Sequence, residues 1–276
     1  DKLGIPTAYS ERVAVPDAER VMREYIAMGY NIIWAHGAQF NTAALKLAKE
    51  FPDICFIMES DAPLTEDIPN IWNMDRNFQT GFYALGALAA LKTKTDKVGY
   101  IGGQDLAFAT GELNAIKQAV DKYKPGLKVS YVFIGDFNDP LKTRQAAEAM
   151  IAEGVDVILG SLNLGTYGLF EAVRAAPREV WVTCKYTDKS GMLPERMMTS
   201  YVYDFSAPVI YAVEQIMKGN KAGYTVIEFG KGKGCYIQFP IKNVSEEIAT
   251  EIQNICDGIE AGTIKVIKEL KTKPTF

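Results

Sequence analysis

Ten side chains with useful hydrogen-bonding or stacking groups follow apolar, strand-like runs of the sequence. Aromatic rings can stack on a flat ligand, which is worth about 1–3 kcal/mol per base. Amides offer a donor and an acceptor together, and carboxylates accept charge-assisted hydrogen bonds. The pattern therefore indicates reversible binding of a small polar ligand, and the candidate residues are His36, Phe40, Asn41, Gln104, Phe108, Asn163, Tyr186, Asp188, Tyr203 and Asp204.

Each candidate also has a structural interpretation, which the sequence leaves open. His36 is the only histidine of the chain; it could donate to or accept from a ligand in its neutral form, or simply be hydrogen-bonded within the fold. Aromatic residues in the loops of α/β proteins commonly pack in the core or at its rim. Aspartate and asparagine at such positions commonly form caps and turns.

The residue patterns of common catalytic and metal sites are missing. No Ser-His-Asp arrangement with a nucleophile elbow surrounds the single histidine, and no Cys/His spacing is typical of zinc. The glycine turns resemble phosphate loops, but "YIGGQDL" is not GxGxxG and "GSLNLGT" lacks the lysine of a P-loop. We therefore expect a binding protein with no enzyme activity, no metal, no cofactor and an unphosphorylated ligand.

Strands and helices alternate almost throughout, and this alternation must position the candidates. Strands are expected over 5–14, 30–37, 54–60, 70–75, 96–103, 128–137, 155–161, 179–188, 196–204, 224–232 and 234–240. Helices are expected over 16–29, 41–52, 78–94, 110–126, 139–154, 166–176, 207–220 and 245–262. Two successive series, joined near Lys92 to Asp96, predict an α/β protein with two doubly wound, mostly parallel sheets.

Ligands of such sheets bind outside the carboxyl ends of the strands, where the ten candidates fall. We expect two lobes that face each other across a cleft: residues 1–94 with 205–222, and residues 95–204 with 223–250. Residues 251–276 would add a C-terminal helix and tail. The first complete unit begins at Ile5, so we infer that a preceding strand and helix are missing from lobe 1. Alternatively, the C-terminal segment supplies that strand.

Composition narrows the class of protein. The chain has 276 residues, 48% of them hydrophobic, and a net charge of −4, which disfavours a nucleic-acid partner. No apolar run reaches the roughly 18 residues of a membrane span, and no signal peptide opens the chain. Four cysteines suggest buried thiols, although Cys235 and Cys256 could pair.

Five segments in order resemble the basic membrane protein family, the substrate-binding lipoproteins of ABC importers. They are "YNIIWAHGAQFNTAALKLAKEFPDICF", "TGFYALGALAALKTKTDKVGYIGG", "VDVILGSLNLGTYGLFEAV", "MMTSYVYDFSAPVIYAVEQIMKG" and "IEAGTIKV". The resemblance implies a two-lobed type I periplasmic binding fold with three hinge crossovers. It also implies an extracytoplasmic monomer that binds a purine nucleoside or base, serves an ABC permease, and is lipid-anchored through an N-terminal segment absent here.

The resemblance also implies roles for particular residues. Asp188 falls where the family has a ribose-binding aspartate, and Tyr203 and Asp204 lie in a crossover that carries contacts. The sequence departs from the family at Thr80-Gly81, at Tyr186-Thr187-Asp188 and at "TGELN". The particular purine or other small ligand therefore stays open. So do two other classes, an enzyme acting on nucleosides or sugars and a sensory ligand-binding domain.

Overall fold

The computed structural model describes residues 3–276, which form two compact units. Unit 1 takes in the chain as far as Arg76 together with Phe205–Glu228. Unit 2 contains Asn77–Asp204 and Phe229–Phe276. The chain therefore passes between the units after Arg76, after Asp204 and after Glu228.

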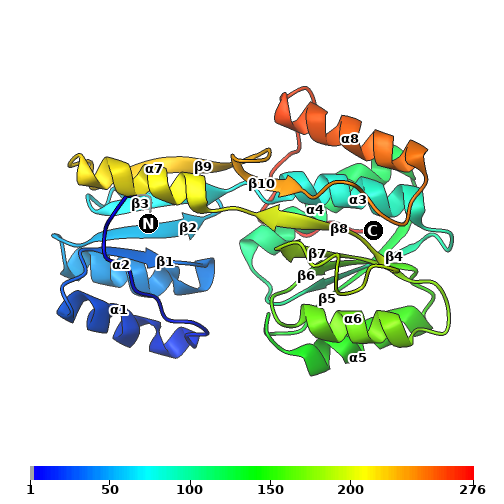
Figure 1. Cartoon of the computed structure of the whole chain (residues 1–276), viewed down its shortest axis with the longest axis horizontal. Coiled ribbons are helices and arrows are strands. Elements are labelled where there is room, and N and C mark those ends of the chain that lie inside the picture. The colour runs from blue at the N-terminus through cyan, green and yellow to red at the C-terminus, as the bar shows by residue number, and fades with distance from the viewer. Residues whose placement is uncertain (1–2) are drawn as a thin grey trace. The chain divides into compact units, whose positions relative to one another are not determined.

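Unit 1 is built on a parallel sheet. Its strands are β1 (Ile32–Ala35), β2 (Cys55–Ser60), β3 (Ile71–Arg76) and β9 (Gly223–Phe229), in the order β1-β2-β3-β9. Its helices are the 3₁₀ turns η1 (Val15–Asp17) and η2 (Ala38–Phe40) and the α-helices α1 (Ala18–Ala27), α2 (Asn41–Glu50) and α7 (Ser206–Met217). In Figure 1, α1 and α2 cover one face of this sheet and α7 covers the other.

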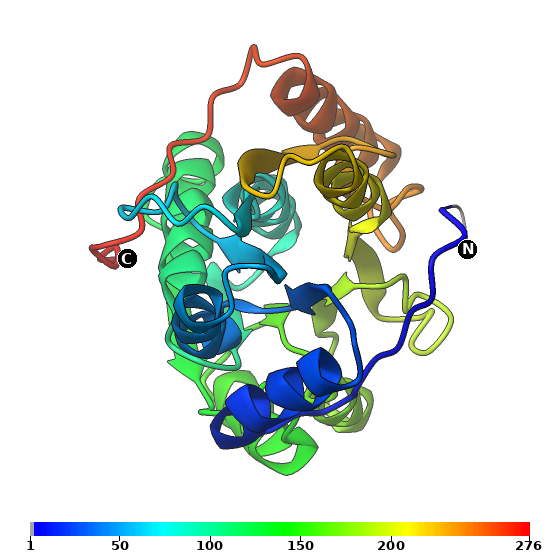
Figure 2. The same cartoon turned by 90° about the vertical axis from the view of Figure 1, so that its left-hand side faces the viewer.

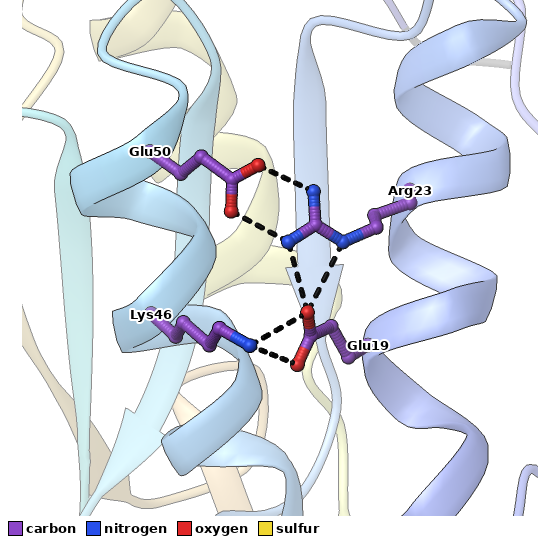
Figure 3. A network of polar contacts seen from close by, with 4 residues as sticks. All are labelled: Glu19, Arg23, Lys46 and Glu50. Carbon is purple, nitrogen blue, oxygen red and sulfur yellow. Dashed lines mark hydrogen bonds and ion pairs between the residues drawn. The ribbon is translucent and has the colours of Figure 1, made fainter.

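The helices α1 and α2 are fixed by an apolar interface and by a charged network. Met22 of α1 and Leu47 of α2 are buried in one hydrophobic cluster with residues of β1 and β2. At the surface, Arg23 donates to Glu19 and Glu50, and Lys46 donates to both oxygens of Glu19 at 2.9 Å (Figure 3). Apolar packing in the interior and ion pairs at the surface thus both join α1 to α2.

Unit 2 has a mixed sheet in which only one neighbouring pair is antiparallel. Its strands are β4 (Lys97–Gly102), β5 (Lys128–Phe133), β6 (Val157–Ser161), β7 (Trp181–Tyr186), β8 (Met197–Tyr203) and β10 (Gly234–Ile237), in the order β10-β8-β7-β6-β4-β5. Its helices are α3 (Gln79–Lys92), α4 (Ala107–Tyr123), α5 (Pro140–Ala152), α6 (Thr166–Ala175) and α8 (Glu246–Glu260). Figure 1 shows α3 and α4 on one face and α5 and α6 on the other.

The apolar helix α3 approaches its neighbours closely because its glycines lack side chains. A Cβ at Gly81 would lie 2.2 Å from the ring of Tyr201 in β8, and one at Gly86 would lie 2.9 Å from the backbone of Ile116 in α4. Side chains at these positions would clash, so Gly81 allows α3 to lie close to the sheet and Gly86 allows it to lie close to α4. The face of the sheet beneath α3 and α4 carries the unusual polar residues described below.

After α8, the C-terminal segment runs beside α4, as the red trace in Figure 2 shows. Asn114 donates to the carbonyls of Glu269 and Thr272 at 3.1 and 2.8 Å. Gln118 donates to the carbonyl of Ile267 and accepts from its N–H. Two amides of α4 thus satisfy backbone groups of a segment that has no helix or strand of its own.

The elements follow the expected pattern except at the start of the described chain. Residues 5–14 form no strand, and most of their side chains are exposed. A strand was expected there, but the segment pairs with none of the strands of unit 1. The four cysteines are buried free thiols, so Cys235 and Cys256 do not pair. Burial raises the pKa of both thiols to about 12, which keeps them protonated.

The compact units differ from the expected lobes in two segments. Residues 77–94 belong to unit 2, because α3 packs on α4 and α8. Residues 223–228 belong to unit 1, because β9 pairs with β3. Both differences arise from packing between segments that are distant in the sequence.

Candidate functional site

The carboxyl ends of the strands in unit 1 hold a group of polar side chains, which we call the polar group: His36, Asn41, Glu59, Asp61 and Arg76. The register of the strands pairs Ala35 with Met58 and Ser60 with Asp75, so the carboxyl ends of β1, β2 and β3 meet at one edge of the sheet. His36 follows β1 directly, and its Nδ1 is hydrogen-bonded to the carboxylate of Glu59. The side chain of Glu59 is buried, whereas that of His36 is 51% exposed.

The pKa of His36 is raised above its ordinary value. Burial alone would lower this pKa, but the charge of Glu59 and the hydrogen bond to it favour the imidazolium more strongly. His36 also meets two aromatic rings edge-on, with centroids 4.8 Å away for Trp34 and 4.9 Å for Phe205. The imidazole is therefore held by a carboxylate and two rings, and half of its surface stays open.

Arg76 and Asp61 form a second ionic contact at the same edge. The guanidinium donates to both carboxylate oxygens of Asp61, at 3.1 and 2.7 Å, and to the carbonyl of Ser60 at 3.3 Å. The side chain of Arg76 is 3% exposed and that of Asp61 is 11% exposed. Such a two-pronged pair has a fixed geometry and the strength of charge-assisted hydrogen bonds.

The two other candidates in unit 1 have structural contacts. Phe40 in η2 is partly buried and packs against the hydrophobic cluster beneath α1 and α2. Asn41 begins α2 and donates to the carbonyl of Glu59 at 2.7 Å, while its buried Oδ1 has no hydrogen-bond partner among the described residues. Asn41 therefore has one buried acceptor that the described residues leave unsatisfied.

Unit 2 brings five aromatic rings together at the corresponding ends of its strands, and we call them the aromatic group: Phe78, Phe108, Phe137, Tyr186 and Tyr203. Phe78 and Tyr203 are stacked with centroids 4.1 Å apart, and Phe108 and Phe137 are nearly parallel with centroids 6.2 Å apart. Tyr186 meets Tyr203 edge-on at 4.9 Å, and Phe78 meets Phe108 edge-on at 6.5 Å. Three of the five rings were candidates from the sequence.

Tyr186 has an unusual backbone conformation. Its φ is 77°, in the left-handed region that bulky residues rarely adopt. Such a conformation costs about 1–3 kcal/mol, and outliers of this kind cluster at functional sites. Tyr186 is the last residue of β7, so the unusual conformation coincides with the end of the strand.

A buried ion pair lies beside the aromatic group. The ammonium of Lys185 is 3.8 Å from Glu112 Oε1, and both side chains are 0% exposed. The hydroxyl of Tyr100 donates to Glu112 Oε2 at 2.6 Å. The charge of Glu112 contributes, after burial, to raising the pKa of Tyr100 well above its ordinary value. The pair joins β7 to α4 on the face of the sheet that α3 and α4 cover.

The remaining candidates lie in loops around the aromatic group, with different contacts. Asn163 is exposed, and its N–H donates to the carbonyl of Phe137 at 3.0 Å. The N–H of Asp204 donates to the carbonyl of Gly234 at 2.7 Å, and Gln104 accepts from the N–H of Leu106. These contacts fix the backbone positions of the three residues.

The carboxylate of Asp188 is held by hydrogen bonds to two serines. Its carboxylate accepts from Ser190 N–H at 2.9 Å, from Ser190 Oγ at 3.1 Å and from Ser200 Oγ at 3.1 Å. Burial alone would raise the pKa of Asp188, but these hydrogen bonds lower it below its ordinary value. Asp188 thus closes a turn, which is the structural interpretation that the sequence allowed for it.

Sequence reasoning missed residues whose role depends on contacts: Trp34, Glu59, Arg76, Phe78, Glu112, Phe137, Lys185 and Phe205. One indication was available, because "VTCKY" places a lysine inside an apolar strand and "FATGELNAI" places a glutamate inside an apolar helix. Buried charges need partners, so such residues suggest a pair.

Among residues 3–276, no three His, Cys, Asp or Glu side chains are placed to hold a metal ion. Within the same residues, no helix combines the length and apolar character that crossing a bilayer requires.

Comparison with known proteins gives consistent matches over most of the chain. The family model described as ABC transporter substrate-binding protein PnrA-like matches residues 1–271. Basic membrane protein A2 of Borrelia garinii is 26% identical over 84% of this chain and 69% of its own length. A purine-binding protein of Brucella abortus is 24% identical over 94% of this chain and 72% of its own length. The ABC transporter nucleoside-binding protein BmpA of Lactococcus lactis is 24% identical over 86% and 71%.

Solved structures agree on the fold. A solute-binding protein of an ABC transporter system from Aeropyrum pernix has a TM-score of 0.80 at 18% identity, covering 97% of this chain and 85% of the other. A corresponding protein from Conexibacter woesei has a TM-score of 0.68 at 21% identity, covering 95% and 87%. The fold is that of type I periplasmic binding proteins, as the sequence indicated.

Proposed function

The chain belongs to the family of PnrA-like ABC transporter substrate-binding proteins, and we propose that it binds a purine nucleoside or purine base outside the cytoplasm. In this proposal the protein delivers its ligand to a membrane permease that an ATPase drives. The family consists of substrate-binding proteins and not of enzymes. A ligand that is bound and released unchanged needs flat surfaces and fixed hydrogen-bonding groups, and it needs no acid, base or nucleophile.

The aromatic group of unit 2 is the observation that carries the proposal. Five rings gather at the carboxyl ends of parallel strands; four of them are buried and pack on one another, and Tyr186 is partly exposed. In this proposal a purine stacks on Tyr186 at the edge of the group, and such stacking is worth about 1–3 kcal/mol per base. The left-handed backbone of Tyr186 supports a functional role for this ring, because strained backbone conformations cluster at functional sites. Two relatives named for purine and nucleoside binding support the same ligand class.

Hydrogen-bonding candidates complete the proposal. In unit 1, the half-exposed imidazole of His36 is an accessible hydrogen-bonding group. Gln104, Asn163 and Asp204 are candidates from the loops of unit 2. Asp188 is a weaker candidate for a ribose contact than the sequence suggested, because its carboxylate already accepts three hydrogen bonds.

A thermal-shift screen tests the proposal. The full chain is heated with purine nucleosides, purine bases, pyrimidine nucleosides, sugars and amino acids in separate samples. A ligand at 100 times its dissociation constant stabilises the folded protein by about 2.7 kcal/mol, which raises the melting temperature. We expect shifts with purine nucleosides or bases, followed by calorimetric titration of each hit. Shifts confined to sugars or amino acids would reject the purine proposal.

A further inference from the structure

The ammonium of Lys185 lies among three aromatic rings in unit 2. Its Nζ is 4.8 Å from the ring centroid of Phe108, 5.0 Å from that of Tyr186 and 5.6 Å from that of Phe137. A cation within about 6 Å of an aromatic centroid is attracted by the negative face of the ring. Three rings around one cation are the arrangement with which proteins bind ammonium ligands.

A carboxylate also lies near this ammonium. Glu112 Oε1 lies 3.8 Å from Lys185 Nζ, and Tyr100 donates to the other oxygen of Glu112 at 2.6 Å. Because both charged side chains are fully buried, water solvates neither charge. The positive charge of Lys185 therefore offsets the negative charge of Glu112 inside the protein. A neutral side chain in place of Lys185 would leave Glu112 without this counter-ion.

We propose that Phe108, Phe137, Tyr186 and Glu112 form an ammonium cage that the side chain of Lys185 occupies, and that Lys185 thereby decides which ligands the aromatic group accepts. An organic cation finds its place taken and meets a like charge. An uncharged flat ring meets no such repulsion and can stack on the same rings. Lys185 is in this sense a specificity-determining residue. The inference rests on the proposed function only for the identity of the uncharged ligand.

Chemical rescue tests the cage. Lys185→Ala removes three carbons and the ammonium, which together correspond to propylammonium. We expect the variant to melt at a lower temperature than the wild type and to regain stability when propylammonium is added. 1-Propanol has a similar size and no charge, and it should bind at least about tenfold more weakly, a ratio that corresponds to ~1.4 kcal/mol.

Two matched variants show whether the rescue acts at the cage. The double variant Lys185→Ala/Glu112→Gln lacks the counter-ion, so propylammonium should stabilise it no more than 1-propanol does. Lys117→Ala removes a lysine from a partly exposed pair with Asp121, and propylammonium should not change its melting temperature. The wild type should show no shift with propylammonium or tetramethylammonium.

The outcomes separate this inference from the proposed function. Equal rescue by propylammonium and 1-propanol would overturn the cage, because filled volume and not charge would then explain the effect. Binding of tetramethylammonium by the wild type would overturn it too. If Lys185→Ala does not fold, Lys185→Arg provides the second test: it keeps the charge and should retain ligand preference, and a gain of cation binding there would contradict the inference. Failure of every purine to bind the wild type would reject the proposed function while the rescue experiment still decides on the cage.

Discussion

The two units place their charges differently at the carboxyl ends of their strands. In unit 1, His36 pairs with Glu59 and Arg76 pairs with Asp61 among backbone carbonyls, and the imidazole stays half exposed. In unit 2, Lys185 and Glu112 are fully buried and aromatic rings surround the ammonium. The comparison teaches that one edge is suited to hydrogen bonding and the other to stacking. It also predicts that the same kind of substitution will have very different costs in the two units.

The largest effect is expected from the buried pair. Glu112→Gln leaves the ammonium of Lys185 without a counter-ion, and breaking a buried pair from one side costs about 3–5 kcal/mol of unfolding free energy. The double variant Lys185→Met/Glu112→Leu should be more stable than the single variant, because it leaves no buried charge unpaired. Urea unfolding measures both. As a control, Glu148→Gln at the exposed pair with Arg144 should change little. An equally small loss for Glu112→Gln would contradict the contrast between the units.

A smaller effect is expected at the two-pronged contact of unit 1. Asp61→Asn removes the charge that faces Arg76 and weakens two charge-assisted hydrogen bonds, at a cost of about 1.5–3 kcal/mol. The guanidinium keeps the carbonyl of Ser60 as an acceptor, which limits the loss. Urea unfolding at neutral pH measures the change. A loss exceeding that of Glu112→Gln would reverse the order of the two units.

The stability that His36 contributes should depend on pH. Its pKa is higher in the folded protein than the ordinary value of about 6.5, so the folded state binds the proton more tightly than the unfolded state. The extra stability is fully present below about pH 6.5 and is lost as pH rises through the folded pKa. Half of the side chain is exposed, so solvent screening limits the effect to at most about 1 kcal/mol.

Comparison of the wild type with His36→Gln isolates this contribution. The difference in their unfolding free energies should shrink between mildly acidic and mildly alkaline pH. A difference that grows with rising pH would show that His36 is held in its neutral form.

The smallest effect is expected at the charged network between α1 and α2. Arg23→Ala removes contacts to Glu19 and Glu50, while Lys46 still binds Glu19 (Figure 3). All four side chains are partly or largely exposed, so water and salt screen the pairs. The melting temperature should fall slightly at low salt and match the wild type at high salt. A loss that persists at high salt would point to lost packing of Arg23 on Phe51.

The starts of α5 and α8 were predictable from local chemistry, because both carry recognisable capping residues. Asp139 caps α5 ahead of Pro140, and Ser245 caps α8, as their side chains suggest. The conformation of segment 5–14 was not predictable, because a segment forms a strand only where another strand is available to pair. The choice between lobes for 77–94 depended on packing between distant helices, which a single sequence does not show.

The candidate site was predictable in part and for a physical reason. The ends of parallel strands meet at one edge, so position alone predicted that Phe108, Tyr186 and Tyr203 lie near one another, and the structure brings these rings together. The partners Phe137 and Glu112 come from other elements, and no spacing in the sequence connects them to Lys185. The positive φ of Tyr186 could not be inferred, because tyrosine is not a residue type that favours this conformation.

The most direct test of the account measures the affinity of a purine nucleoside for Tyr186 variants by calorimetry. Tyr186→Asn tolerates the left-handed backbone and removes the ring, whereas Tyr186→Phe keeps the ring and removes only the hydroxyl. We predict that Tyr186→Asn weakens binding roughly 5- to 150-fold, the factor that corresponds to about 1–3 kcal/mol of stacking, and that Tyr186→Phe binds nearly as well as the wild type. Undiminished nucleoside binding by a folded Tyr186→Asn variant would contradict the claim that the aromatic group of unit 2 holds the ligand.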